Sequence, residues 1–265
     1  MRETTRHSVS RRDLFRGALA ATGLALGGCR GGAGKPNILW IIAEDFCPDL
    51  SCYGNPDLET PNIDRLASQG MRFTRAFVTG PVCSASRSAL ATGMYQTTIG
   101  AHNHRSHRQD GYRLPEPVRV FTHILQDAGY HTSNLKNSHG LQGTGKTDFN
   151  FQADHVFDGE DWSERKPGQP FYAQINFSET HRAFKRFPKD PTDPDKLTTL
   201  PPYYPDHPAI RLDWACYLDG AKHLDVKVGR VLGRLEEEGL AEDTIVFFFA
   251  DHGRPMPRGK QFLYD

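Results

Sequence analysis

The sequence predicts an α/β fold built on a central, mostly parallel β-sheet that is flanked by helices. Three near-continuous apolar runs of strand length, at residues 37–43, 169–177 and 244–250, are typical of parallel strands that are buried on both faces. Helical patterns fill the stretches between them, as layered α/β domains require. At 265 residues, the chain has room for one large domain or two small ones.

The composition excludes some classes of protein. The 32 basic residues balance the 32 acidic ones and no long basic run occurs, which argues against a dedicated nucleic-acid-binding protein. Hydrophobic residues make up 37% of the chain, enough for a core, and the 25 glycines and 18 prolines predict long loops. Five cysteines are too few for a disulfide scaffold. Cys47 and Cys52 could pair with each other, and their spacing leaves this open.

Residues 1–29 predict an export signal. The stretch SRRDLFR at residues 10–16 resembles a twin-arginine signal, and the apolar stretch after it is too short to span a bilayer. The sequence LGGC that ends at Cys29 resembles a bacterial lipobox; the alternative is an ordinary signal peptide in which Cys29 is incidental. Residues 30–35 predict a flexible tether. We therefore expect export through the twin-arginine machinery to the periplasm or cell envelope, with a lipid at Cys29 as the only membrane contact.

A helix is predicted to follow the first strand. Thr60 is placed as its N-cap, Pro61 suits the first helical position, and Gly70 ends it. Residues 71–77 then predict a strand that leads to the next motif.

Residues 81–93, PVCSASRSALATG, predict a loop that turns into a short helix ending at Gly93. Cys83 would lie at or just before the first turn, where backbone N–H groups and the helix dipole favour an anion. Arg87 is four residues further on and therefore shares its helical face. On spacing alone, a buried cysteine beside a surface arginine explains the pattern as well.

Histidines and arginines crowd residues 100–108. His102, His104 and Arg105 are predicted to form a substrate subsite, because such donors suit anions and hydroxyl groups; a solvated loop is the alternative. His181 follows the strand at residues 169–177, where a histidine can act as a proton donor, or simply be hydrogen-bonded in its loop.

Further scaffold elements complete the pattern. A helix is predicted at residues 118–127 with Phe121 and Ile124 facing inward, and a strand at residues 130–134. A long helix-period stripe predicts a scaffold helix over residues 209–240.

Two of the buried strands end in pairs of metal-ligand residues. Glu44 and Asp45 follow the strand at residues 37–43, and Asp251 and His252 follow the one at residues 244–250. The carboxyl ends of parallel strands open on one edge, so the two pairs would converge unless these acids are merely solvated. Oxygen-rich ligands favour Ca²⁺ or Mg²⁺, and the imidazole leaves room for Mn²⁺ or Zn²⁺. The four residues therefore predict a divalent-metal site, with Ca²⁺ as the favoured ion.

The stretch CSASRSALATG at residues 83–93 resembles the sulfatase signature, Cys-x-Pro/Ala-x-Arg with a trailing Leu-x-Thr-Gly. The resemblance extends, with gaps, from about Lys35 to Asp265, and includes TPNIDRLA at residues 60–67. It implies an alkaline-phosphatase-like α/β fold with the catalytic domain at residues 36–265. It also implies that a formylglycine-generating enzyme oxidises Cys83 to formylglycine, whose hydrate is the nucleophile.

The same resemblance implies roles for other residues. Arg87 would stabilise the nucleophile, His181 would protonate the leaving group, and Lys146 and Lys260 would hold the sulfate oxygens. The resemblance also places the four metal ligands at the two strand ends. The position of the first lysine is open between two stretches: KTDFNF favours Lys146 with Asp148, and Lys136 with His139 is the alternative.

The sequence departs from the family pattern in three places. Glu44 stands where an aspartate is usual and His252 where an asparagine is common, which puts the metal in doubt more than the reaction. The chain also stops at Asp265 within a family stretch, so we expect the C-terminal part of the domain to be missing. The expected function is hydrolysis of a sulfated carbohydrate. The alternatives are a phosphonate or phosphate ester hydrolase on the same scaffold, or a non-catalytic lipoprotein that binds sulfated glycans.

Overall fold

A computed structural model describes residues 34–255, 257 and 259–260. The predicted signal, including Cys29, and most of the tether lie outside the described residues. Contacts separate residues 1–35 from a compact unit formed by residues 36–265, and this unit contains every strand and helix described below. Within the described part of the chain, no helix combines the length and the apolar character needed to cross a membrane.

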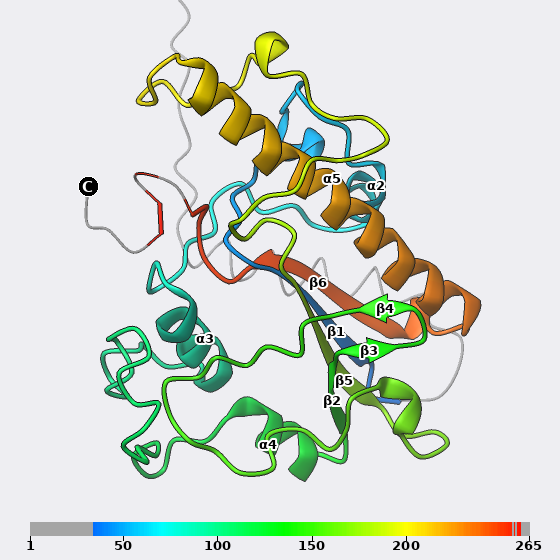
Figure 1. Cartoon of the computed structure of the whole chain (residues 1–265). Coiled ribbons are helices and arrows are strands. Elements are labelled where there is room, and N and C mark those ends of the chain that lie inside the picture. Colours follow the sequence, from blue (N-terminus) through cyan, green and yellow to red (C-terminus); the bar gives the residue numbers. More distant parts are fainter. Residues whose placement is uncertain (1–33, 256, 258, 261–265) are drawn as a thin grey trace, which may run out of the picture. The chain divides into compact units, whose positions relative to one another are not determined.

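The unit alternates strands and helices along the chain (Figure 1). Its elements are β1 (Asn37–Ala43), η1 (Ser51–Tyr53), α2 (Pro61–Gln69), α3 (Cys83–Thr92), α4 (Phe121–Asp127), β2 (His131–Leu135), β3 (Asn137–Ser138), β4 (Leu141–Gln142), η2 (Trp162–Glu164), β5 (Phe171–Phe177), η3 (Pro194–Lys196), α5 (Pro208–Glu237), η4 (Ala241–Asp243) and β6 (Thr244–Ala250).

The main sheet has the strand order β2-β5-β1-β6, and every neighbouring pair is parallel. β1 lies between β5 and β6, with Ala43 opposite Phe177 on one side and Ala250 on the other. The predicted α/β class with a central parallel sheet is confirmed. The carboxyl ends of β1, β5 and β6 therefore lie at the same edge of the sheet. Glu44 and Asp45 follow β1 directly, and Asp251 and His252 follow β6 directly.

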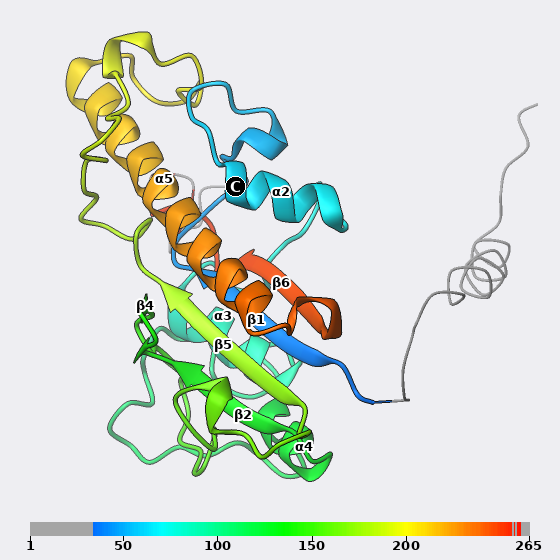
Figure 2. The ribbon, with the colours of Figure 1, turned by 90° about the vertical axis from the view of Figure 1, so that its right-hand side faces the viewer.

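Helices cover the two faces of the sheet (Figure 2). Along β1, Leu39 and Ile41 are fully buried in the core that α5 contributes to. Trp40 points to the opposite face, where its ring centroid lies 4.8 Å from that of Phe121 in α4. Burial on both faces explains why β1 is a continuous apolar run rather than an alternating one.

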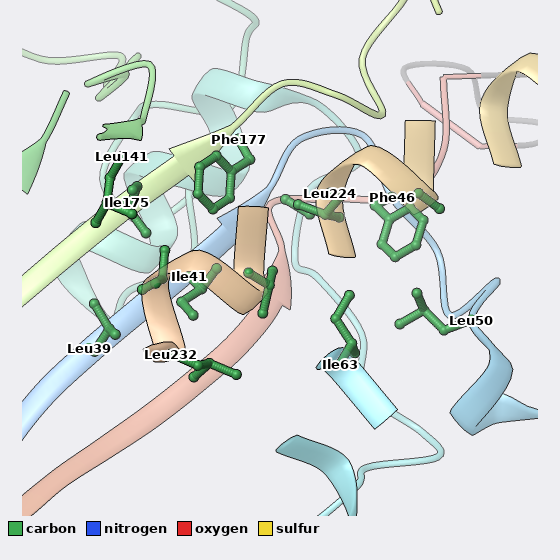
Figure 3. Packing of buried hydrophobic residues seen from close by; sticks show 14 of the residues in the cluster. Leu39, Ile41, Phe46, Leu50, Ile63, Leu141, Ile175, Phe177, Leu224 and Leu232 are labelled. Atoms are coloured by element: carbon green, nitrogen blue, oxygen red, sulfur yellow. The ribbon is translucent and has the colours of Figure 1, made fainter. Parts of the chain in front are cut away.

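The main core lies between the sheet and α5. Ile41 and Phe177 project from the strands toward Leu224 and Leu232 of the helix, as the close-up in Figure 3 shows. The stripe predicted for the long helix is thus confirmed, although the helix itself ends at Glu237. This layer fixes the strand ends from which the site is built.

Three expectations about local structure were wrong. The strand at residues 244–250, β6, is not buried on both faces: it stands last in the strand order, and Ile245 and Phe247 are each 48% exposed. Residues 71–77 do not form a strand, and the side chains of Met71, Phe73 and Phe77 are 80%, 64% and 89% exposed. Strand propensity is expressed only when a neighbouring strand pairs with the segment, and no described strand does so here. The short helix begins at Phe121 rather than at residue 118, and Ile124 is exposed because the two-turn helix buries Thr122 instead. Cys47 and Cys52 are both free thiols.

Candidate active site

The loops after β1 and β6 are locked together by their backbones. The Asp251 N–H donates to the Ala43 carbonyl at 3.0 Å, and the Phe46 N–H donates to the His252 carbonyl at 3.1 Å. The Asp45 N–H also donates to Asp251 Oδ1 at 2.9 Å. Hydrogen bonding between the two chain segments therefore continues past the ends of β1 and β6. This brings the side chains of the two loops together at the edge of the sheet.

Four buried ligand atoms meet at this edge. One atom each from Asp45, Cys83, Asp251 and His252 lies within 4.8 Å of all the others. Two carboxylates and an imidazole form a donor set that suits a divalent cation, and the thiol adds the position of the expected nucleophile. The arrangement can therefore hold a cation directly beside Cys83.

His252 is oriented as a ligand. Its Nδ1 lies 2.8 Å from the Gly253 carbonyl, so Nδ1 carries a proton and Nε2 faces Asp45 Oδ1 at 3.0 Å and Cys83 Sγ at 3.2 Å. Burial alone would lower the pKa of His252, but hydrogen bonds to Asp45 and Cys83 raise it to about 10. A cation bound here would replace the Nε2 proton, so cation and proton compete for this nitrogen.

Asp45 is held as a carboxylate. Its burial would raise the pKa, but hydrogen bonds from His252 and Lys260 lower it to about 2. Lys260 Nζ donates to both oxygens at 3.0 and 2.8 Å, and His181 Nε2 lies 3.7 Å from Oδ2. The structure thus brings Lys260 and His181, two residues singled out in the sequence, to the same carboxylate.

α3 begins at Cys83 and ends as predicted, because Gly93 takes a left-handed conformation with φ of 67° and its N–H donates to the Ala89 carbonyl at 2.8 Å. Arg87 lies one turn after Cys83 and is buried. Its Nε donates to Asp251 Oδ2 at 3.0 Å and its Nη1 to Asn176 Oδ1 at 2.7 Å. The guanidinium therefore faces the ligand group rather than the solvent.

Glu44 stands apart from the four-atom group. Its Oε2 accepts a hydrogen bond from Lys146 Nζ at 2.7 Å, which places this lysine at the edge of the site. Lys136 is exposed, and His139 lies 3.6 Å from Asp161, in the β3–β4 hairpin region. The geometry therefore favours Lys146 over Lys136 as the first lysine of the site.

The basic loop, residues 102–108, lies against the first turn of α3. The Arg105 N–H donates to the buried Ser84 Oγ at 2.8 Å, and His104 Nδ1 lies 3.0 Å from the same oxygen. Burial, followed by the charge of Arg105, lowers the pKa of His104 and favours its neutral form. His102 is exposed, and among the described residues no contact ties it to the site.

Comparison of the chain with known proteins identifies its family. The family model described as Sulfatase matches residues 36–165 and 158–264, which together span most of the chain. The chain belongs to the sulfatase family. An ulvan-active sulfatase of Formosa agariphila is 31% identical over 282 residues, covering 87% of this chain and 46% of that protein.

Other members of the sulfatase family extend the likeness. The N-sulphoglucosamine sulphohydrolase of Homo sapiens is 28% identical over 285 residues, covering 93% of this chain and 56% of that protein. The solved yidJ structure of Bacteroides fragilis has a TM-score of 0.65 at 20% identity, and covers 86% of this chain and 64% of that chain. This sulfatase chain thus spans about half the length of the curated relatives it matches.

Two residues that support the candidate site were not expected from the sequence. Asn176 is fully buried near the end of β5 and orients Arg87; a polar residue late in a buried strand was the available signal. The Tyr217 hydroxyl, buried in α5, accepts from the Cys47 N–H at 3.2 Å and donates to Asp49 Oδ2 at 2.9 Å. Nothing in the helical stripe distinguishes this tyrosine from a core residue.

Proposed function

We propose that this chain carries the catalytic centre of a sulfatase that hydrolyses a sulfate ester or N-sulfate of a sulfated carbohydrate. The observation that carries the proposal is the position of Cys83, whose Sγ belongs to the same 4.8 Å group as Asp45, Asp251 and His252. Membership of the sulfatase family supports it, as does the N-sulphoglucosamine in the name of one relative.

The proposal includes a divalent cation and the oxidation of Cys83 to formylglycine. Asp45, Asp251 and His252 would hold the cation, which supplies polarisation of a sulfate oxygen and lowers the pKa of an attacking hydroxyl. The carboxylates suit Ca²⁺ or Mg²⁺, and the imidazole also suits Mn²⁺ or Zn²⁺. Formylglycine in its hydrated form would supply both the attacking hydroxyl and a second hydroxyl, so that sulfate can leave without attack by water at sulfur.

Cationic side chains that pair with the acids of the site are proposed to bind and stabilise the sulfate. Lys260, on Asp45, and Lys146, on Glu44, each present an ammonium group to the sulfate oxygens and offset the charge that develops there. Arg87 is buried one helical turn after Cys83 and pairs with Asp251, and its charge would stabilise a deprotonated nucleophile. The preorganised ion pairs hold these groups in place before the substrate arrives.

His181 is proposed as the proton donor. Its Nε2 lies 3.7 Å from Asp45 Oδ2, on a loop that follows β5, and its side chain is 37% exposed. A histidine at the open side of the site can protonate the oxygen or nitrogen that leaves the sulfur. His104 and Arg105 would contact the sugar on the side of the basic loop.

One observation favours a second candidate, a phosphonate or phosphate ester hydrolase. His252 provides a nitrogen ligand where many sulfatases are expected to provide an amide, and this broadens the choice of cation. The same donors would also suit a phosphoryl group, so substrate tests must include both ester classes.

The experiment begins with protein produced together with a formylglycine-generating enzyme. Mass spectrometry of the peptide that contains Cys83 is expected to show conversion of the thiol to the aldehyde. Sulfate release from sulfated mono- and oligosaccharides is then compared with cleavage of a phosphonate monoester. Converted, cation-loaded protein that cleaves only the phosphonate would favour the second candidate. Converted protein that binds sulfated sugars without turnover would favour a glycan-binding lipoprotein instead.

The site of action is also a proposal. We propose twin-arginine export and lipid attachment at Cys29, on the sequence of residues 1–29. In a bacterial host, labelling with a radioactive fatty acid is expected for the wild type and to be lost in Cys29→Ala. Labelling that persists in this variant would contradict the lipid at Cys29.

A further inference from the structure

A buried carboxylate gathers the cations of the basic loop. The side chain of Asp148 is only 3% exposed, and it accepts hydrogen bonds from Arg105 Nε at 3.0 Å and Nη2 at 2.8 Å. Arg108 Nη2 donates to its Oδ1 at 2.6 Å, and Lys146 Nζ lies 4.0 Å from its Oδ2. Burying a carboxylate is costly unless it is fully hydrogen-bonded, so this one fixes the positions of its partners.

Asp148 does not neutralise all of the positive charge around it. Burial would raise the pKa of Asp148, but Arg105 and Arg108 lower it, so the carboxylate stays ionised and offsets one of the two guanidinium charges. A guanidinium has five N–H donors; Arg105 uses Nε and Nη2 on Asp148, and Arg108 uses Nη2 alone. Their side chains are 37% and 53% exposed. Both arginines therefore keep donors that can reach a ligand.

These donors lie close to the reacting group. The backbone of Arg105 is tied to Ser84, the neighbour of Cys83 in the first turn of α3. Lys146, whose Nζ donates to Glu44 Oε2 at 2.7 Å, also lies 4.0 Å from Asp148 Oδ2. Asp148 and its two arginines therefore lie beside the edge of the site, on the side of Ser84 and Lys146.

We propose that Arg105 and Arg108 form a second anion subsite, which binds a carboxylate or second sulfate on the sugar that carries the scissile sulfate or on its neighbour. Asp148 is the positioning residue that holds the two guanidiniums side by side. This inference rests on the proposed function, because the second anion is defined relative to the scissile sulfate. The substrate class is accordingly a sugar with at least two anionic groups.

Binding tests the subsite without turnover. Protein with Cys83 left as cysteine is titrated with a monosulfated disaccharide, a disulfated one, and one that carries a sulfate and a uronic carboxylate. We expect the dianionic sugars to bind about 10-fold more tightly than the monosulfated one, as added charge-assisted hydrogen bonds allow. In Arg105→Gln/Arg108→Gln this ratio is expected to fall to about 1. Preference for only one dianion identifies the anion that the subsite takes.

The matched control is Arg119→Gln, which removes an exposed arginine that pairs with Asp127 at 2.8 Å on α4. It is expected to keep the 10-fold ratio and the wild-type Tm. Equal binding of mono- and dianionic sugars by the wild type would overturn the subsite, as would an unchanged ratio in the double variant.

Sulfate release from 4-nitrophenyl sulfate by the converted protein separates this inference from the proposed function. Release without any preference for dianionic sugars overturns the subsite alone. Preference for dianionic sugars without release from any sulfate ester overturns the proposed hydrolysis and leaves the subsite standing. Arg105→Gln/Arg108→Gln removes both guanidinium partners of the buried Asp148, so its Tm and circular dichroism are measured with the binding ratio. Arg108→Gln alone leaves Arg105 on Asp148 and is expected to keep the wild-type fold while lowering the ratio.

Discussion

The face of the main sheet that α5 covers and the carboxyl edge of the sheet bury different kinds of side chain. Between the sheet and α5, burial removes apolar surface from water: Leu39, Ile41 and Leu224 are fully buried. At the carboxyl edge, burial instead encloses charge, as in Asp45 and Asp251. The apolar layer gains free energy in proportion to the buried area, whereas each enclosed charge is costly unless a partner meets it.

Stability and chemistry therefore reside in different regions. The apolar layer also contains a buried ion pair between Arg234 and Asp161. Arg234 donates a 2.8 Å hydrogen bond to each carboxylate oxygen of Asp161. At the edge, acids and cations are also paired, but they are gathered around Cys83, as Lys260 is on Asp45 and Arg87 on Asp251. Substitutions in the two regions are expected to separate activity from stability.

The largest expected effect is at Cys83. Cys83→Ala is expected to reduce sulfate release by at least about 10⁴-fold, because it removes the nucleophile. The free energy of unfolding is expected to change by less than about 1 kcal/mol, since alanine nearly fills the same space. Sulfate release and urea unfolding measure the two quantities. Cys216→Ala, at a free thiol on α5, is the control and is expected to retain activity.

Leu224→Ala reverses the pattern. It is expected to lower the free energy of unfolding by about 3–4 kcal/mol, because a fully buried leucine is replaced and a cavity remains. Turnover per folded molecule should match the wild type at a temperature where both are folded. A large loss of turnover in the folded variant would show that the apolar layer and the catalytic edge are not separable.

Asp161→Asn tests the buried ion pair of the apolar layer. Burial would raise the pKa of Asp161, but Arg234 lowers it well below its usual range. A depressed pKa in the folded state stabilises the protein fully above the unfolded pKa near 3.8, and this stabilisation is lost as the pH falls toward the folded value. The variant is expected to be about 2–3 kcal/mol less stable at pH 7.

The measurement is urea unfolding from pH 7 to pH 2. The difference between wild type and Asp161→Asn should shrink as the pH falls below about 4. A difference that stays constant over this range would mean that packing, rather than the charge, sets the effect.

The smallest effect is expected where the two regions meet. Tyr217→Phe removes the hydroxyl that bridges the Cys47 N–H and Asp49 from within α5. The loss is expected to be about 1 kcal/mol of stability, as for one buried hydrogen bond. A few-fold weaker affinity for Ca²⁺ or Mn²⁺, measured by calorimetry, is also expected, because Cys47 follows the loop that carries Asp45. An unchanged affinity for the cation would show that Tyr217 contributes only to stability.

The strands and the main site residues could be predicted because each carries a local signal. β1 and β6 are uninterrupted apolar runs, and Asp45 and Asp251 follow them directly. Residues 71–77 could not be assigned correctly, because their alternating pattern needs a pairing partner that sequence alone does not locate. Glu44 was expected beside Asp45 as a ligand, and this stays a prediction; its contact with Lys146, across 102 residues of sequence, could not be foreseen from the local pattern. The sequence indicated Asp148 only through the motif KTDFNF. Its contacts with Arg105 and Arg108 could not be predicted, because these arginines lie in another loop.

The parallel pairing of β1 has a consequence for the order of events during synthesis. Asn37 and its partner Thr244 are 207 residues apart, so β1 cannot be enclosed between β5 and β6 until at least 207 further residues have been made. Cys83 is buried in the finished fold, yet 169 residues must still follow it before His252 is made. At about 5–20 residues per second, this gives roughly 10–30 s in which Cys83 lies on an open chain. A modifying enzyme that needs access to this thiol therefore works within a time set by the topology of the sheet.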